Sequence, residues 1–149
     1  MPNNQVDFYL ITNQISDAKY KFASRLANKL QRLKQKTLLV ATDLESLERL
    51  DQIMWSYSDI SFVAHESISQ ASSHTIIQMA LPTQIDDALL QNNYKVVINL
   101  TESVLESCAD VDRIAEVVEH TETAKSSARQ RFRAYRAQDF IINTHNIEL

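Results

Sequence analysis

Two kinds of segment alternate along the chain, and their hydrophobic patterns predict strands and helices in turn. Short runs of nearly continuous apolar, β-prone residues are typical of strands, and those at 37–42 and 95–100 indicate strands buried in a sheet. The segment around 115–120 is ambiguous between strand and helix, and a strand is favoured. We expect strands at 6–12, 37–42, 60–65, 75–81, 95–100 and 115–120.

Two longer segments have the i, i+3/i+4 spacing of amphipathic helices. The first carries apolar residues from Phe22 to Leu33, spans about five turns and has Ser16 as its candidate N-cap. The second begins at the capping-box sequence Thr42–Glu45 and ends near Trp55. Shorter helical stretches are expected at 84–90, where a loop is the alternative, and at 103–111.

This alternation of strands and helices predicts an α/β fold with a mostly parallel sheet. The sequence shows no internal repeat and no linker, so we expect residues 1–149 to form one domain. Ligand sites in such folds usually lie at the carboxyl ends of the strands.

The sequence contains no glycine, whereas an average chain of this length would have roughly ten. Phosphate-binding P-loops and dinucleotide-binding turns need glycine for close approach of the backbone, so neither motif is present. Backbone positions with positive φ must therefore be filled by other residues. We expect asparagine or aspartate there, with turns at the pairs Asn3–Asn4 and Asn92–Asn93.

Other signals of chemistry are weak. Cys108 is the single cysteine, has no evident base partner and is interpreted as inert packing in a reducing cytosol. The first residues have no basic region typical of a secretory signal, and no apolar run is long enough to span a membrane. The histidines lack the spacing of a metal site: His65, His74, His120 and His145. We expect a cytoplasmic protein without metal or cofactor, although distant residues could still assemble a catalytic triad.

Positive charge is concentrated near the end of the chain. Residues 1–124 hold 10 basic and 17 acidic residues, a net of -7, whereas residues 125–149 hold 5 basic and 2 acidic, a net of +3. A last helix is expected from Thr121–Thr123 to about Arg136. One face of this helix carries four cations: Lys125, Arg129, Arg133 and Arg136. An apolar stripe of Ala128, Phe132 and Tyr135 lies beside them, and Arg131 is predicted to point elsewhere.

Three interpretations of this helix compete. It could be a solvated helix whose aromatic side chains reach the core. It could bind nucleic acid, since basic and aromatic residues form a stacking and phosphate surface, but the acidic remainder of the chain would repel a long polyanion. It could also border a pocket for a short acidic peptide with an apolar end, whose carboxylates the arginines would hold.

Three motifs resemble the chi subunit of bacterial DNA polymerase III holoenzyme: LDQIMW at Leu50–Trp55, SFVAHE at Ser61–Glu66 and RQRFRAYRAQDFIIN at Arg129–Asn143. Their order and spacing cover nearly the whole chain. The resemblance implies a Rossmann-like three-layer α/β fold and an accessory subunit without intrinsic catalysis. The alternative is an α/β enzyme of nucleotide-binding type that has lost its glycine loop.

The resemblance also implies two partners. One is the psi subunit, whose surface would include Trp55 and Phe62, and the resemblance leaves open whether an accessory helicase shares that surface. The other is the acidic C-terminal tail of single-stranded DNA-binding protein, which ends in an apolar residue. We expect the chain itself to bind little nucleic acid directly. The tail site implied by position comprises Lys125, Arg129, Phe132, Arg133, Arg136 and Thr144.

One position departs from the chi pattern. A glycine usually precedes the final F-x-x-N, and Asp139 stands there in this chain. If the turn needs positive φ, aspartate adopts it at some cost, and its carboxylate should slightly weaken the binding of an acidic peptide nearby.

Overall fold

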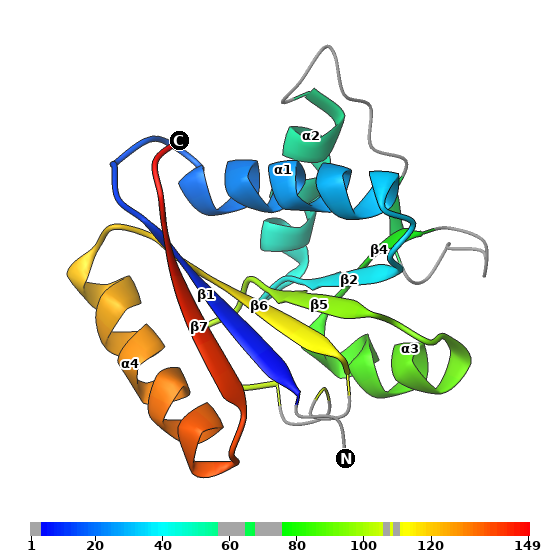
Figure 1. Cartoon of the computed structure of the whole chain (residues 1–149). Helices are drawn as coiled ribbons and strands as arrows, with labels where there is room; N and C mark the ends of the chain where they lie inside the picture. Colours follow the sequence, from blue (N-terminus) through cyan, green and yellow to red (C-terminus); the bar gives the residue numbers. More distant parts are fainter. Residues whose placement is uncertain (1–3, 57–64, 68–75, 106–107, 109–110) are drawn as a thin grey trace.

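The computed structural model describes residues 4–56, 65–67, 76–105, 108 and 111–149. Seven strands form one sheet in the order β3-β4-β2-β5-β6-β1-β7, and each neighbouring pair is parallel. Helices α1 and α2 cover one face of the sheet, and α3 and α4 cover the other (Figure 1). The predicted three-layer α/β fold is therefore confirmed.

The elements follow one another largely in the predicted order, but β7 is not among the strands expected from the sequence, and residues 103–105 of the helix expected at 103–111 are not helical. Their bounds are β1 (Gln5–Ile11), α1 (Ala18–Arg32), β2 (Thr37–Val40), α2 (Leu44–Ser56), β3 (His65–Ser67), β4 (Ile77–Ala80), the 3₁₀ turn η1 (Pro82–Gln84), α3 (Ile85–Gln91), β5 (Val96–Asn99), β6 (Arg113–Val118), α4 (Glu122–Ala137) and β7 (Ile141–Ile147). Of the predicted strand at 60–65, residues 60–64 lie outside the described residues, as do 106–107 and 109–110 of the predicted helix at 103–111.

The core lies in two layers, one on each side of the sheet. Strand β1 supplies both, because successive side chains of a strand point to opposite faces. Val6 and Phe8 pack in the layer beneath α4, whereas Tyr9 and Ile11 pack in the layer beneath α1. The sheet thus presents the ring of Phe8 to α4.

Two predicted helix starts are wrong by one residue. Asp17, not Ser16, is the N-cap of α1, and the Asp17 carboxylate forms an ion pair with Arg49. At α2, the Asp43 carboxylate accepts the backbone N–H of Ser46 at 2.8 Å, so the cap is one residue later than the predicted box. The first helix also ends earlier than its apolar pattern indicates, and Leu33, its C-cap residue, is 56% exposed.

Three residues of the described chain have positive φ: Asp17 (57°), Lys34 (58°) and Asp139 (63°). The predicted asparagine turns are wrong, because Asn92 is extended with φ of -138° and the other described members of the two pairs do not have positive φ. Asn3 lies outside the described residues. The conditional expectation for Asp139 is confirmed, since this residue adopts the left-handed conformation.

Lys34 and Asp139 both end helices in the same way. After α1, Lys34 N–H donates to Gln31 O at 3.0 Å and Gln35 N–H donates to Leu30 O at 2.9 Å. After α4, the N–H groups of Asp139 and Phe140 make the equivalent bonds to Arg136 and Tyr135. This is the Schellman motif, in which glycine normally takes the left-handed position. The chain therefore closes its two longest helices with side chains that strain the backbone.

Replacing the strained lysine should stabilise the protein. We predict that Lys34→Gly raises the free energy of unfolding by about 1 kcal/mol, because the left-handed conformation costs a residue with a Cβ roughly 1–2 kcal/mol and glycine adopts it freely. Urea denaturation measures the change. The matched control is Lys29→Gly, an exposed position inside the same helix, which should lower the free energy of unfolding by about 1 kcal/mol. Equal losses in both variants would contradict the prediction.

Candidate functional site

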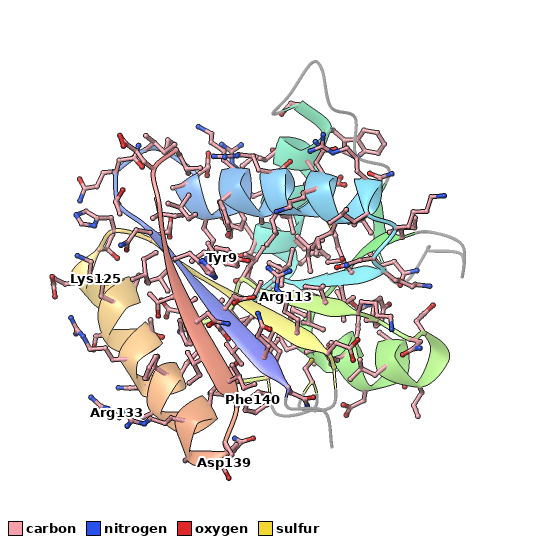
Figure 2. The ribbon with its side chains drawn as sticks, in the orientation of Figure 1. Tyr9, Arg113, Lys125, Arg133, Asp139 and Phe140 are labelled. Carbon is pink, nitrogen blue, oxygen red and sulfur yellow. The ribbon has the colours of Figure 1, made fainter. Side chains whose placement is uncertain are left out.

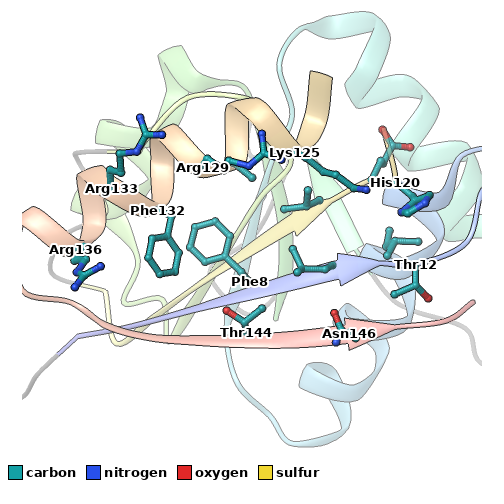
Figure 3. A pocket seen from close by; sticks show the side chains of 15 residues that line it. Phe8, Thr12, His120, Lys125, Arg129, Phe132, Arg133, Arg136, Thr144 and Asn146 are labelled. Carbon is teal, nitrogen blue, oxygen red and sulfur yellow. The ribbon is translucent and has the colours of Figure 1, made fainter. Parts of the chain in front are cut away.

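A pocket with a volume of about 660 Å³ lies between α4 and the strands β1 and β7 (Figure 3). Helix α4 begins where predicted, since the Thr121 hydroxyl accepts the backbone N–H of Ala124 at 3.1 Å. All six residues predicted for the tail site line this pocket. The lining comprises Phe8, Leu10, Ile11, Thr12, Val118, Glu119, His120, Lys125, Ala128, Arg129, Phe132, Arg133, Arg136, Thr144 and Asn146.

The inner wall of the pocket is apolar. Phe132 is half-buried, and its ring centroid lies 5.6 Å from that of Phe8, which is buried in β1. Leu10 and Val118 extend the same surface from β1 and β6. An apolar side chain inserted here would meet rings and aliphatic groups, which is the environment it prefers to water.

The rim of the pocket is cationic. Arg129, Arg133 and Arg136 are exposed, and Lys125 is half-buried. Within the described part of the chain, none of these four side chains makes a hydrogen bond or an ion pair. Figure 3 shows them in a row along α4, with Arg136 at one end and Lys125 at the other. Among the described residues, Glu119 supplies the one carboxylate that lines the pocket. The rim is therefore free to bind an anionic ligand.

Strand β7 forms the opposite side of the pocket. It runs beside β1 in register, with Thr144 opposite Phe8 and Asn146 opposite Leu10. Both Thr144 and Asn146 are exposed and line the pocket. The hydroxyl and amide groups provide hydrogen-bonding partners across from the arginine row.

Sequence reasoning missed the contribution of β1 to this site. The alternation in 6–12 places Phe8 and Leu10 on one face of a strand, which is a usable signal. The same alternation does not say which helix covers that face. Only the strand order, with β1 between β6 and β7, brings Phe8 beneath Phe132.

Arg131 does not belong to the rim and is not a solvated residue. Its side chain is 4% exposed, and its Nε–H donates to Oε1 of Glu116 at 2.8 Å. Glu116 lies in β6 and is fully buried. The Nη1 group of Arg131 also donates to the hydroxyl of Ser127 at 2.6 Å. The prediction that Arg131 points away from the row is confirmed, and the structure assigns it a place in the core.

Two further donors complete the surroundings of Glu116. Tyr135 O–H donates to Oε2 at 2.5 Å, and Asn99 Nδ2–H donates to the same oxygen at 2.9 Å. Burial raises the pKa of Glu116, and the charge of Arg131 and the three donors oppose that rise. Burial, and then the charge of Glu116, raise the pKa of Tyr135. Because every partner donates, the site fits an ionised carboxylate.

Asp139 lies in the turn between α4 and β7 and does not line the pocket (Figure 2). Phe140, the next residue, packs edge-on against Tyr135 with ring centroids 5.4 Å apart. This contact is the hydrophobic part of the Schellman motif. The main consequence of the missing glycine is thus backbone strain at the end of α4.

The surface predicted for psi lies on the other side of the sheet. Trp55 is in the last turn of α2, is 49% exposed, and its indole N–H donates to Oδ1 of Asp51 at 3.1 Å. Leu44, in the first turn of α2, is also exposed. Phe62, the second residue predicted for this surface, lies outside the described residues.

The crevice at the carboxyl ends of β2 and β5 bears on the nucleotide-binding alternative. It has a volume of about 540 Å³, and Lys19 and Glu102 are its charged lining residues. The Lys19 ammonium donates to the carbonyl of Leu100 at 3.1 Å, and the Glu102 carboxylate would repel a phosphate. This crevice is less suited to an anion than the pocket beside α4.

Cys108 and the histidines are the remaining candidate groups, of which His74 lies outside the described residues. Cys108 is buried, and burial raises the pKa of its thiol to about 12, as expected of inert packing. Within the described residues, no three histidine, cysteine or acidic side chains are grouped to hold a metal ion. No helix among these residues has the length and apolar character needed to cross a membrane.

Comparisons with known proteins agree with the sequence motifs. The family model for the DNA polymerase III chi subunit, HolC, matches residues 3–143. The chain is 27% identical to DNA polymerase III subunit chi of Pseudomonas aeruginosa, covering 96% of each chain. It is 23% identical to the Escherichia coli subunit chi, covering 92% of this chain and 94% of that one.

A likeness to a solved structure concerns the fold alone. The crystal structure of T4 UvsW superposes with a TM-score of 0.72 at 8% identity. That match covers 97% of this chain but 41% of UvsW.

The ion pair beneath α4 should be essential for stability. We predict that Arg131→Ala lowers the free energy of unfolding by about 3–5 kcal/mol, because it leaves the buried Glu116 carboxylate without its countercharge. Thermal or urea denaturation measures the loss. Arg129→Ala, which removes an exposed arginine of the same helix, is the control and should change stability by less than about 0.5 kcal/mol. Similar stabilities of the two variants would show that the buried pair is dispensable.

Proposed function

The chain belongs to the family of DNA polymerase III chi subunits, and we propose that its pocket beside α4 binds the acidic C-terminal tail of single-stranded DNA-binding protein. As a chi subunit it is an accessory subunit of DNA polymerase III. In our proposal the whole chain, residues 1–149, acts as one non-catalytic domain in the cytoplasm. It links the replicase to single-stranded DNA that is coated by the binding protein.

One observation carries this proposal: four cations that have no ion-pair or hydrogen-bond partner among the described residues border an apolar slot. A peptide tail with aspartates and an apolar last residue is complementary to this pocket. Its carboxylates match the cations of the rim, and its apolar end matches the apolar wall. Its last side chain would pack in the pocket against the ring of Phe132. Its terminal carboxylate would then lie within reach of Arg129, one turn before Phe132 on α4. Bidentate contacts between guanidinium and carboxylate favour such an arrangement.

The charge distribution supports a peptide over a nucleic acid. Residues 1–124 carry a net charge of -7, so a long polyanion that extends beyond the pocket meets repulsion. A short peptide that stays within the pocket meets the four cations of the rim instead. The pocket volume also falls in the range typical of sites for small ligands.

A second surface is proposed for the psi subunit. An exposed tryptophan at a helix end, with Leu44 exposed on the same helix, is typical of a surface that a partner covers. This surface is on the opposite face of the sheet from the α4 pocket. The two partners could therefore bind at the same time, as a linking subunit requires.

Arg129 should be the main anchor of the tail. We predict that Arg129→Ala lowers the affinity for a synthetic tail peptide roughly ten- to hundredfold, because it removes a partly desolvated, charge-assisted contact. Lys125→Ala should lower the affinity less than about fivefold, since an ion pair at a flanking position that water reaches contributes about 0–1 kcal/mol. Calorimetry measures both. Deleting the last residue of the peptide should be as damaging as Arg129→Ala, and the two losses should not add, because both remove one contact.

The control for this experiment is Arg25→Ala. It removes one exposed arginine from α1, which does not line the pocket, and leaves the same net charge as Arg129→Ala. Arg25→Ala should change the affinity for the tail peptide only slightly. Equal losses for Arg25→Ala and Arg129→Ala would indicate diffuse attraction and would argue against a defined pocket. A peptide that fails to bind the unaltered protein would refute the proposed function.

Trp55 should matter for psi and not for folding. We predict that Trp55→Ala abolishes co-purification with psi while it changes the melting temperature little, because about half of this side chain is exposed. Leu90→Ala is the control, since Leu90 is an exposed apolar residue of α3 on the other face of the sheet. Leu90→Ala should change neither the co-purification with psi nor the melting temperature. Loss of folding in Trp55→Ala, or retained psi binding, would contradict the assignment of this surface.

A further inference from the structure

Strand β7 is an edge strand, and among the described residues no strand pairs with its outer side. It is the last strand in the sheet order and pairs with β1 in unbroken register from Ile141 to Ile147. Its sequence, IINTHNI, has no lysine, no acidic residue and no proline. Natural proteins usually protect an edge with such residues, with a bulge or by keeping the strand short. The outer side of β7 is therefore available as a template for another strand.

The backbone of β7 directs alternate residues to the open edge. Ile141 N–H donates to Asn4 O at 3.0 Å, and Thr12 N–H donates to Ile147 O at 2.8 Å. Because hydrogen bonding alternates along a strand, the odd-numbered residues of β7 bond to β1. The N–H and C=O groups of Ile142, Thr144 and Asn146 consequently point away from β1.

The open edge and the pocket share residues. Thr144 and Asn146 line the pocket, so their side chains are on the face of the sheet that α4 covers. The same two residues present their backbone groups at the edge. A chain lying along this edge would have every second side chain directed toward the pocket and the cations of α4.

We propose that the acidic peptide binds as an additional strand of the sheet, hydrogen-bonded to the edge of β7 at Ile142, Thr144 and Asn146. This inference rests on the proposed function and adds how the peptide is held. Strand addition supplies affinity through the backbone, and alternate side chains supply specificity. The free cations of the rim provide the charge complementarity for the aspartates of such a strand.

The row of cations also sets the direction of the added strand. Along β7, from its start toward its end, the α4 side chains are passed in the order Arg136, Arg133, Arg129 and Lys125 (Figure 3). A terminal carboxylate at Arg129 with upstream acids at Arg133 and Arg136 requires the peptide to run in the same direction as β7. The added strand is therefore parallel, like all other neighbouring pairs of the sheet.

Side chains of the peptide that point to the opposite face would meet little that selects them. That face of β7 carries His145, whose Nε2 lies 3.3 Å from Oδ1 of Asp7 and whose ring stacks on Tyr9. These groups already bind one another. Peptide positions should therefore alternate between those that are recognised and those that are not.

A scan with backbone N-methyl groups tests this arrangement. The probe is a short synthetic peptide that is rich in aspartate and ends in phenylalanine with a free carboxylate; each residue is N-methylated in turn. Methylation at positions whose N–H faces β7 should lower the affinity about tenfold or more, and the intervening positions should change it little. The protein is unaltered throughout, so no variant can fail to fold.

Amide hydrogen exchange measured by NMR provides a second readout. On addition of the unmodified peptide, the amides of Ile142, Thr144 and Asn146 should become protected, whereas those of Asn143 and His145 should already be protected in the free protein. Protection of the edge amides without peptide would mean that a second copy of the chain occupies the edge, and would overturn the inference.

The outcomes separate the two proposals. If the peptide binds in the pocket but the N-methyl scan is flat, strand addition is wrong and the proposed function stands. If the unmodified peptide does not bind at all, both are wrong.

Discussion

The position of α4 depends on the buried ion pair between Arg131 and Glu116. A charged pair in the core is costly to desolvate, and it is tolerated only when geometry and further hydrogen bonds satisfy both groups. Here Ser127, Arg131 and Tyr135, each one turn apart on α4, meet in this network, and Asn99 joins from β5. Rotating or shifting the helix would leave a buried carboxylate unsatisfied. The pair therefore fixes which face of α4 is turned outward.

That fixed rotation determines the pocket. With Arg131 directed into the sheet, Phe132 is placed over Phe8 at a ring distance of 5.6 Å, and the remaining four cations fall along the rim. The five basic residues of α4 thus have two roles: Arg131 balances an internal charge, and the other four have no partner in the described part of the chain. Because both walls belong to regular elements, the site is preorganised, which reduces the ordering cost that a ligand must offset.

The sequence predicted this organisation in part, and the failures have physical causes. Apolar runs and helical spacing located the main elements, because local pattern determines which face is buried. The role of Arg131 could not be predicted from spacing, since its partner Glu116 comes from a different element. The available sign of a buried ion pair was the lone glutamate within the apolar strand 113–118. The left-handed Lys34 was missed because residue preference favours asparagine, whereas the position of a helix end is fixed by packing. The left-handed conformation of Asp139 was anticipated because the chi pattern that the sequence resembles places a glycine there.

The same sorting of charges explains how an acidic protein can present a basic site. Arg131 is neutralised by Glu116, and Asp139 lies outside the pocket, so the local field comes from four cations opposed by Glu119. At physiological salt, exposed charges are screened over about 8 Å, so a ligand within the pocket responds mainly to this local group. A ligand that extends beyond it also meets the surrounding excess of carboxylates. The selectivity that we propose, for a short acidic segment over a long polyanion, would follow from the small extent of the cationic rim, and the buried pair that orients α4 sets that extent.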